Sequence, residues 1–99
     1  MADMLTADHF LPHVNQVFRV KESGHALTLS RVELRRMEER ELATLGRQSF
    51  TLIFAGPPDN LLHEGLYTLE VDQGPAFQIY VIPVQTLARD RQDYQAVFN

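Results

Sequence analysis

The chain has 99 residues, a length that fits one domain over residues 1–99 with one modest core. It contains no cysteine, which excludes disulfides, thiolate nucleophiles and cysteine-based metal sites. Nine basic residues against thirteen acidic ones give a net charge of -4. Nucleic acids and anionic membranes reward clustered positive charge, so neither is expected as a partner.

The first eight residues show no basic region followed by an apolar run, so no signal peptide is expected. No stretch approaches the roughly 20 apolar residues that a membrane-spanning helix needs. We therefore expect a cytoplasmic protein.

A short helix is predicted near the beginning of the chain. Thr6 is a good N-cap, and Pro12 removes a donor and clashes with the preceding turn. We expect about two turns that end within residues 11–14. Asn15 tolerates the left-handed backbone that stops a helix.

From residue 16 onward the apolar residues recur with a period of two, which is typical of half-buried strands. Leu27 and Leu29 have the opposite parity to Val32 and Leu34, so a continuous strand needs a β-bulge near residues 30–31. Six strands are predicted, over residues 16–21, 27–35, 48–55, 67–71, 77–84 and 94–98.

The segment 36–46 admits two interpretations. It is rich in helix formers, and Gly46 would end a helix well. Its apolar residues, however, make no clean helical stripe, so a charged loop with one helical turn is the preferred prediction. A helix is the alternative.

Six strands joined by short turns predict a mainly β protein, an antiparallel roll or small barrel with a short N-terminal helix over one end or face. An immunoglobulin-like β-sandwich is the alternative, although a seventh strand is lacking.

Two segments offer candidate interaction residues. Leu61 and Leu62 are consecutive apolar residues in the connection 57–66, with His63 beside them. They either plug an open barrel end or form an exposed docking patch. Arg35 and Arg36 belong to the main basic cluster, which is interleaved with glutamates; this pattern predicts a solvated mixed surface or a site for an acidic partner.

No catalytic, metal or cofactor site is expected. His9 and His13 have i, i+4 spacing, but Pro12 distorts that turn and no third histidine accompanies them. The pair His63 and Glu64 could do acid–base chemistry, or form an ordinary polar turn. The glycines are scattered among turns and make no nucleotide-binding loop.

The order of landmarks resembles an uncharacterised bacterial family known only as a domain of unknown function. The matching pieces span nearly the whole chain: Leu5-Thr6-x-x-x-Phe10, Phe50-x-Leu52-x-Phe54-x-Gly56-Pro57, Leu62-x-x-Gly65-x-Tyr67-x-Leu69-Glu70, Val81-x-Pro83-Val84 and Tyr94-x-Ala96-Val97-Phe98-Asn99. The resemblance implies no catalytic residue. It implies genes that lie near those of phage-tail-collar-like proteins, and hence an assembly or accessory role.

These observations favour a non-enzymatic interaction or accessory module whose partner is a protein, in or near a phage-tail-like assembly. One alternative is a small-molecule-binding barrel or modest hydrolase that uses Asp59, His63 and Glu64 at an open barrel mouth. Another alternative is a structural subunit of a homo-oligomer, formed by extending a sheet between copies.

Overall fold

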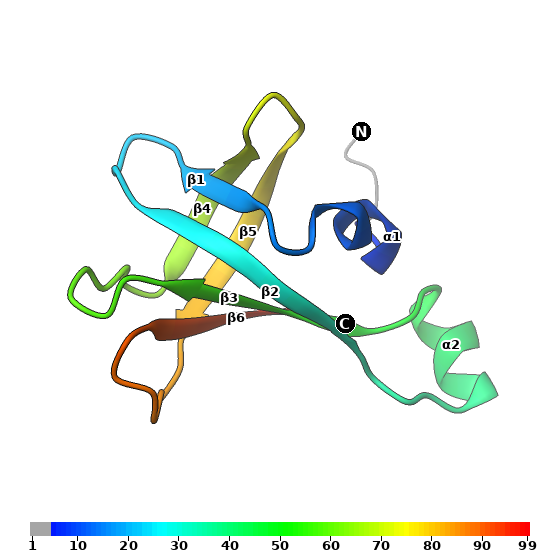
Figure 1. Cartoon of the computed structure of the whole chain (residues 1–99). Helices are drawn as coiled ribbons and strands as arrows, with labels where there is room; N and C mark the ends of the chain where they lie inside the picture. Colours follow the sequence, from blue (N-terminus) through cyan, green and yellow to red (C-terminus); the bar gives the residue numbers. More distant parts are fainter. Residues whose placement is uncertain (1–4) are drawn as a thin grey trace.

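The computed structural model describes residues 5–99 and shows a six-stranded antiparallel barrel with two short helices outside it (Figure 1). Residues 1–4, on which part of the signal-peptide argument depends, lie outside the described residues. The elements in chain order are α1 (Ala7–Phe10), the 3-10 turn η1 (Leu11–His13), β1 (Val17–Val20), β2 (Ala26–Leu34), α2 (Glu39–Leu45), β3 (Phe50–Gly56), β4 (Gly65–Val71), β5 (Ala76–Pro83) and β6 (Gln92–Phe98).

The strands close in the order β1-β2-β3-β6-β5-β4, and β4 pairs with β1 to complete the ring. Every strand pair is antiparallel. The prediction of a mainly β barrel with a short N-terminal helix is therefore confirmed, and the sandwich alternative is wrong. Within residues 5–99 no helix is long and apolar enough to cross a membrane.

The N-terminal helical segment begins and ends where the sequence predicts. Thr6 is the N-cap of α1, and its backbone N–H donates to Nδ1 of His9 at 2.9 Å. The 3-10 turn η1 continues α1 to His13, and Asn15 then takes a φ of 72°. This left-handed residue turns the chain into β1.

The predicted β-bulge is present in β2. The register with β3 shifts between Leu29 and Arg31, so Val32 lies opposite Leu52 and Leu34 opposite Phe50. Residues directly opposite each other share a face of the sheet. The bulge therefore returns Leu34 to the inner face, although its place at the end of β2 leaves it 59% exposed.

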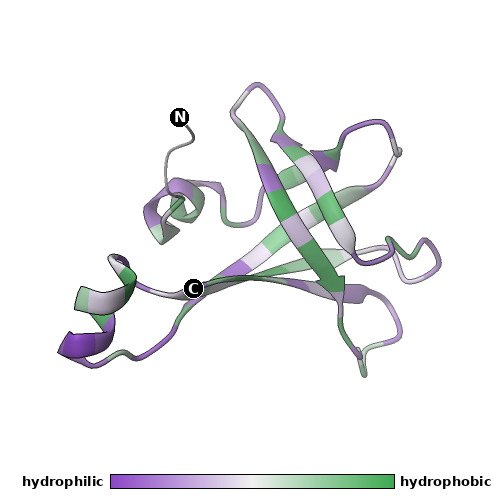
Figure 2. Ribbon diagram, turned by 180° about the vertical axis from the view of Figure 1, so that it is seen from behind, coloured by the Kyte–Doolittle hydropathy of each residue, from purple (hydrophilic) through white to green (hydrophobic). Residues whose placement is uncertain are grey.

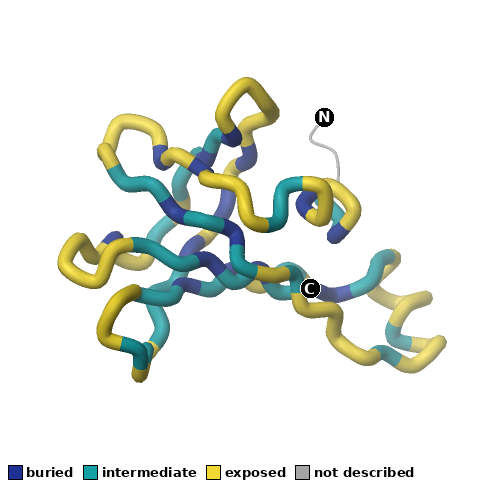
Figure 3. The backbone as a smooth tube through the Cα atoms, in the orientation of Figure 1, coloured by how far each residue is buried: buried dark blue, intermediate teal, exposed yellow. Residues whose placement is uncertain are grey.

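The preferred prediction for residues 36–46, a loop with one helical turn, is wrong, because α2 spans Glu39–Leu45. Local signals explain the helix: the Glu41 carboxylate accepts the backbone N–H of Glu38 at 3.2 Å, and Gly46 ends the helix with a φ of 76°. None of the seven residues is buried (Figure 3), which explains why the sequence shows no apolar stripe.

The inward side chains of all six strands fill the barrel. Apolar and polar residues alternate along the ribbons in the matching way (Figure 2). Phe10 of α1 joins the inward side chains and is fully buried. Its ring centroid lies 4.6 Å from that of Phe77, 5.7 Å from Phe98 and 5.9 Å from Phe50. The buried apolar residues are Ala7, Phe10, Phe18, Val20, Leu27, Leu29, Phe50, Leu52, Phe54, Leu62, Leu69, Val71, Phe77, Ile79, Val81, Tyr94 and Ala96.

Candidate functional site

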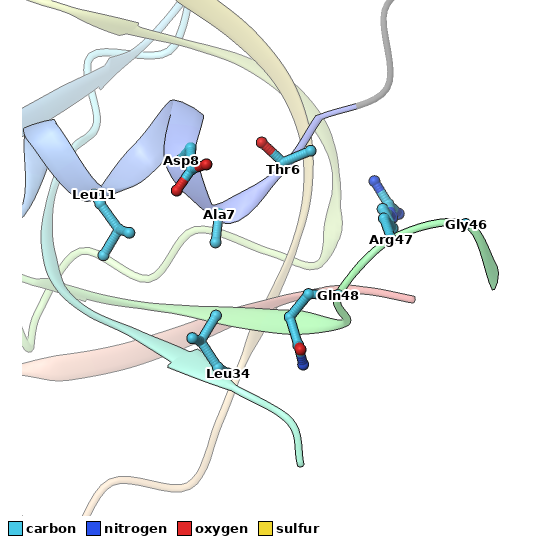
Figure 4. A pocket seen from close by; sticks show the side chains of 8 residues that line it. All are labelled: Thr6, Ala7, Asp8, Leu11, Leu34, Gly46, Arg47 and Gln48. Atoms are coloured by element: carbon cyan, nitrogen blue, oxygen red, sulfur yellow. The ribbon is translucent and has the colours of Figure 1, made fainter. Parts of the chain in front are cut away.

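A groove of about 410 Å³ lies between the α1–η1 segment and the end of the barrel where β2 leads into α2 (Figure 4). We call it the α1 groove. Its lining comes from three separate segments: Thr6, Ala7, Asp8 and Leu11 from the helical segment, Leu34 from β2, and Gly46, Arg47 and Gln48 from the chain entering β3.

Two exposed leucines face each other across the α1 groove. Leu11 points from η1 towards the sheet and is 48% exposed, whereas Leu34 points from β2 back towards the helix (Figure 4). Leucine side chains that face each other in solvent lose contact with water when a third apolar group enters between them. The groove therefore offers an apolar contact of limited size within a polar rim.

Arg47 closes one end of the α1 groove and joins distant parts of the chain. Its guanidinium donates to the backbone oxygen of Asn99, from Nη2 at 2.7 Å and from Nε at 3.1 Å, and also donates to the backbone oxygen of Leu5. Its Cζ lies 5.9 Å from the ring centroid of Phe50 and 5.8 Å from that of Phe98. The planar guanidinium suits both the carbonyls and the ring faces.

The candidate residues of the connection 57–66 lie at the opposite end of the barrel from the α1 groove (Figure 1). Leu62 is 3% exposed, and its backbone N–H donates to the hydroxyl oxygen of buried Tyr94 at 2.9 Å. Leu61 is 45% exposed and His63 is also exposed. The two leucines thus differ: Leu62 fills the barrel end, and Leu61 is open to solvent.

Arg35 and Arg36 lie near the α1 groove, directly after β2. Nη2 of Arg35 donates to the Glu41 carboxylate at 2.9 Å. The pKa of Glu41 is lowered by the backbone hydrogen bond from Glu38 first and by Arg35 second. The structure therefore places the two groups of predicted interaction residues, 35–36 and 61–63, at opposite ends of β3 rather than in one site.

Glu64 is engaged by a neighbouring strand rather than by His63 or Asp59. Its carboxylate accepts the hydroxyl of Tyr80 in β5, a hydrogen bond that raises the pKa of Tyr80. The backbone oxygen of His63 accepts the hydroxyl of Tyr67 at 2.7 Å. These contacts brace the connection against β4 and β5.

The histidines near the N-terminus have local partners. Nδ1 of His9 faces Thr6, and Nδ1 of His13 lies 2.9 Å from Oε1 of Gln16. Among the described residues there is no group of three or more histidine, cysteine, aspartate or glutamate side chains that could hold a metal ion.

Sequence reasoning did not single out Leu11, Leu34, Arg47 or Gln48, which line the α1 groove. One signal was available for Leu34, because a bulge before it restores the inner-face parity at the very end of a strand. Nothing local in the sequence marks Arg47, since its partners lie 42 and 52 residues away.

The comparisons with known proteins give a family without an assigned activity. No curated protein and no solved structure matches the chain. The description of the matching family is "Domain of unknown function (DUF6916)", and the match covers residues 5–98. The chain therefore belongs to this family of unknown function.

Proposed function

We propose that this protein is a non-enzymatic interaction module that binds a protein partner at the α1 groove. The observation that supports it is the pair of facing, half-exposed leucines, Leu11 and Leu34, in a groove of about 410 Å³. Exposed apolar contacts framed by polar groups are typical of protein-binding surfaces.

The charged residues beside the groove suit a partner that carries both signs. Asp8 lines the groove, and Arg36 lies two residues after Leu34 on the connection to α2. A partner segment with an apolar side chain for the leucines, a basic group for Asp8 and an acidic group for Arg36 fits this surface best. Leu61 and His63, at the other end of the barrel, remain a second predicted contact surface.

The first candidates for the partner are phage-tail-collar-like proteins, which the family resemblance implies as genomic neighbours. We expect the tagged chain to co-purify with such a neighbour after co-expression. The groove variant is Leu34→Asp, which places a charge in the apolar contact. Leu34 is already exposed, so we expect the barrel to keep its stability.

The matched control is Leu87→Asp, because Leu87 is 93% exposed and does not line the groove. We expect the partner to be retained by wild type and by Leu87→Asp, and lost by Leu34→Asp. Equal retention by both variants would overturn the groove as the binding site. Turnover of a substrate by the purified chain, with no neighbour bound, would overturn the interaction function itself.

A further inference from the structure

One edge of β5 carries backbone groups that no other strand within residues 5–99 pairs. The N–H of Val71 donates to the carbonyl of Pro75 at 3.0 Å. This bond shows which residue pairs of the β4–β5 ladder are hydrogen-bonded. Hydrogen-bonded pairs alternate in an antiparallel ladder, so Phe77 and Ile79 bond to β4. The alternate residues direct their N–H and C=O groups away from β4; they are Ala76, Gln78 and Tyr80.

Strand β6 does not cover these three residues. It pairs with β5 only at Ile82 and Pro83, and Val84 adds one hydrogen bond to Asp93 at 3.1 Å. From Ile82 back towards Ala76, strands β5 and β6 diverge. Figure 2 shows β5 in front, with no strand along its side away from β4. No backbone hydrogen bond reaches Ala76, Gln78 or Tyr80 from α1, η1 or β6.

The free edge of β5 carries exposed residues and lacks the usual protection against pairing. Ala76, Gln78 and Tyr80 are all exposed. Natural edge strands commonly carry lysine, proline within the paired stretch or an inward charge, whereas β5 has no charged residue and its proline lies at position 83. Leu66, opposite Tyr80 on β4, adds a side chain that is 57% exposed.

We propose that a second copy of this chain pairs with the free edge, so that two β5 strands run antiparallel about a two-fold axis. In the register with Gln78 opposite Gln78 of the second copy, Ala76 lies opposite Tyr80. This is the one symmetric register in which all three free residues find hydrogen-bonded partners, because shifting it by one residue leaves one of the three outside.

Electrostatics favours this contact between identical chains. Two copies that each carry a net charge of -4 repel each other wherever acidic surfaces meet. Strand β5 itself has no charged side chain, and the nearby Glu64 carboxylate is engaged by the Tyr80 hydroxyl. The pairing also places small Ala76 beside the bulky Tyr80 of the other copy, which avoids a clash at both ends of the contact.

Sedimentation of the full chain across the micromolar range tests the pairing. We expect wild type to form a reversible dimer, and Gln78→Lys and Gln78→Glu each to weaken it by about fivefold, because like charges then face each other on the two-fold axis. An equal mixture of the two variants should recover dimerisation as a heterodimer. Hydrogen exchange at the Gln78 and Tyr80 amides should slow as the protein concentration rises.

Thr68→Lys is the matched control, since Thr68 lies opposite Gln78 on the same outer face but one strand inward from the free edge. It should dimerise like wild type, and thermal unfolding should show that all variants are folded. A wild type that stays monomeric throughout, a Gln78→Lys variant that dimerises normally, or a mixture no better than its components would each overturn the proposal.

Discussion

The rings of Phe50 and Phe98 are stacked, with centroids 4.7 Å apart and an interplanar angle of 5°. They belong to a hydrogen-bonded pair at the ends of β3 and β6, and the Arg47 guanidinium lies near both rings. This stack joins the C-terminal strand to the start of β3 beneath α1. The last strand of the chain is thus held by side chains as well as by its ladder.

Truncation of Phe98 tests how much the stack stabilises the barrel. Phe98 is half-buried rather than fully buried, so we expect Phe98→Ala to lower the free energy of unfolding by about 2 kcal/mol, below the usual cost for a fully buried phenylalanine. Urea denaturation measures the change. Val97→Ala, on the exposed outer face of the same strand, should cost less than about 0.5 kcal/mol; equal losses for the two variants would contradict the stack.

The hydrogen bond between Leu62 and Tyr94 joins the connection 57–66 to the core. Tyr94→Phe removes the hydroxyl oxygen and leaves a buried N–H without its acceptor, so we expect a loss of about 1–3 kcal/mol in thermal or urea unfolding. Tyr67→Phe removes an exposed hydroxyl whose carbonyl partner can turn to water, and its effect should be smaller. A Tyr94→Phe variant as stable as wild type would contradict the hydrogen bond between Leu62 and Tyr94.

The two adjacent leucines of this connection should respond differently to truncation. Leu62→Ala opens a cavity at the barrel end and should cost about 2–4 kcal/mol. Leu61→Ala removes a side chain already in solvent and should change stability by less than about 0.5 kcal/mol. The pair of unfolding curves provides its own control, and a reversed order would contradict the described burial.

The hydrogen bond from Tyr80 to Glu64 predicts a late tyrosine titration. Because the hydroxyl donates to a carboxylate, the pKa of Tyr80 is raised above its ordinary value. Absorbance of the phenolate should show one tyrosine ionising at higher pH than in Glu64→Gln, and Tyr80→Phe should remove that component.

The raised pKa of Tyr80 also predicts how the stability of the protein changes with pH. A folded-state pKa raised above the unfolded value stabilises the protein fully below the ordinary tyrosine pKa of about 10, and this contribution is lost as pH rises through the raised value. Alkaline unfolding of wild type and Tyr80→Phe should therefore converge at high pH. If Tyr80 ionised at a pH below the ordinary tyrosine pKa, the hydrogen bond to Glu64 would be contradicted.

Gly46 provides a local test of α2. Its φ of 76° suits glycine, and a Cβ added there would meet no atom within 4 Å. Gly46→Ala should therefore cost about 1 kcal/mol through backbone strain alone. Gly46→Asn should cost less, since asparagine tolerates this conformation better. Thermal unfolding separates the two, and equal stability of wild type and Gly46→Ala would contradict the left-handed cap.

Local patterns were enough to predict most of the barrel. Period-two burial identified all six strands, the parity change between Leu29 and Val32 identified the bulge, and Asn15 identified the end of the N-terminal helix. Each of these depends on neighbours a few residues away, so the sequence alone carries the information. The same local logic failed for α2, because a helix that buries none of its residues leaves no apolar stripe in the sequence.

Only the tertiary structure decided where the two proposed contact surfaces lie. Leu11 and Leu34 become neighbours through a bulge and a helical segment that are distant in sequence, and Arg47 meets Leu5 and Asn99 through closure of the barrel. The free edge of β5 likewise depends on how far β6 follows it. Strand order and strand divergence arise from packing the whole chain around one core, which no local spacing records.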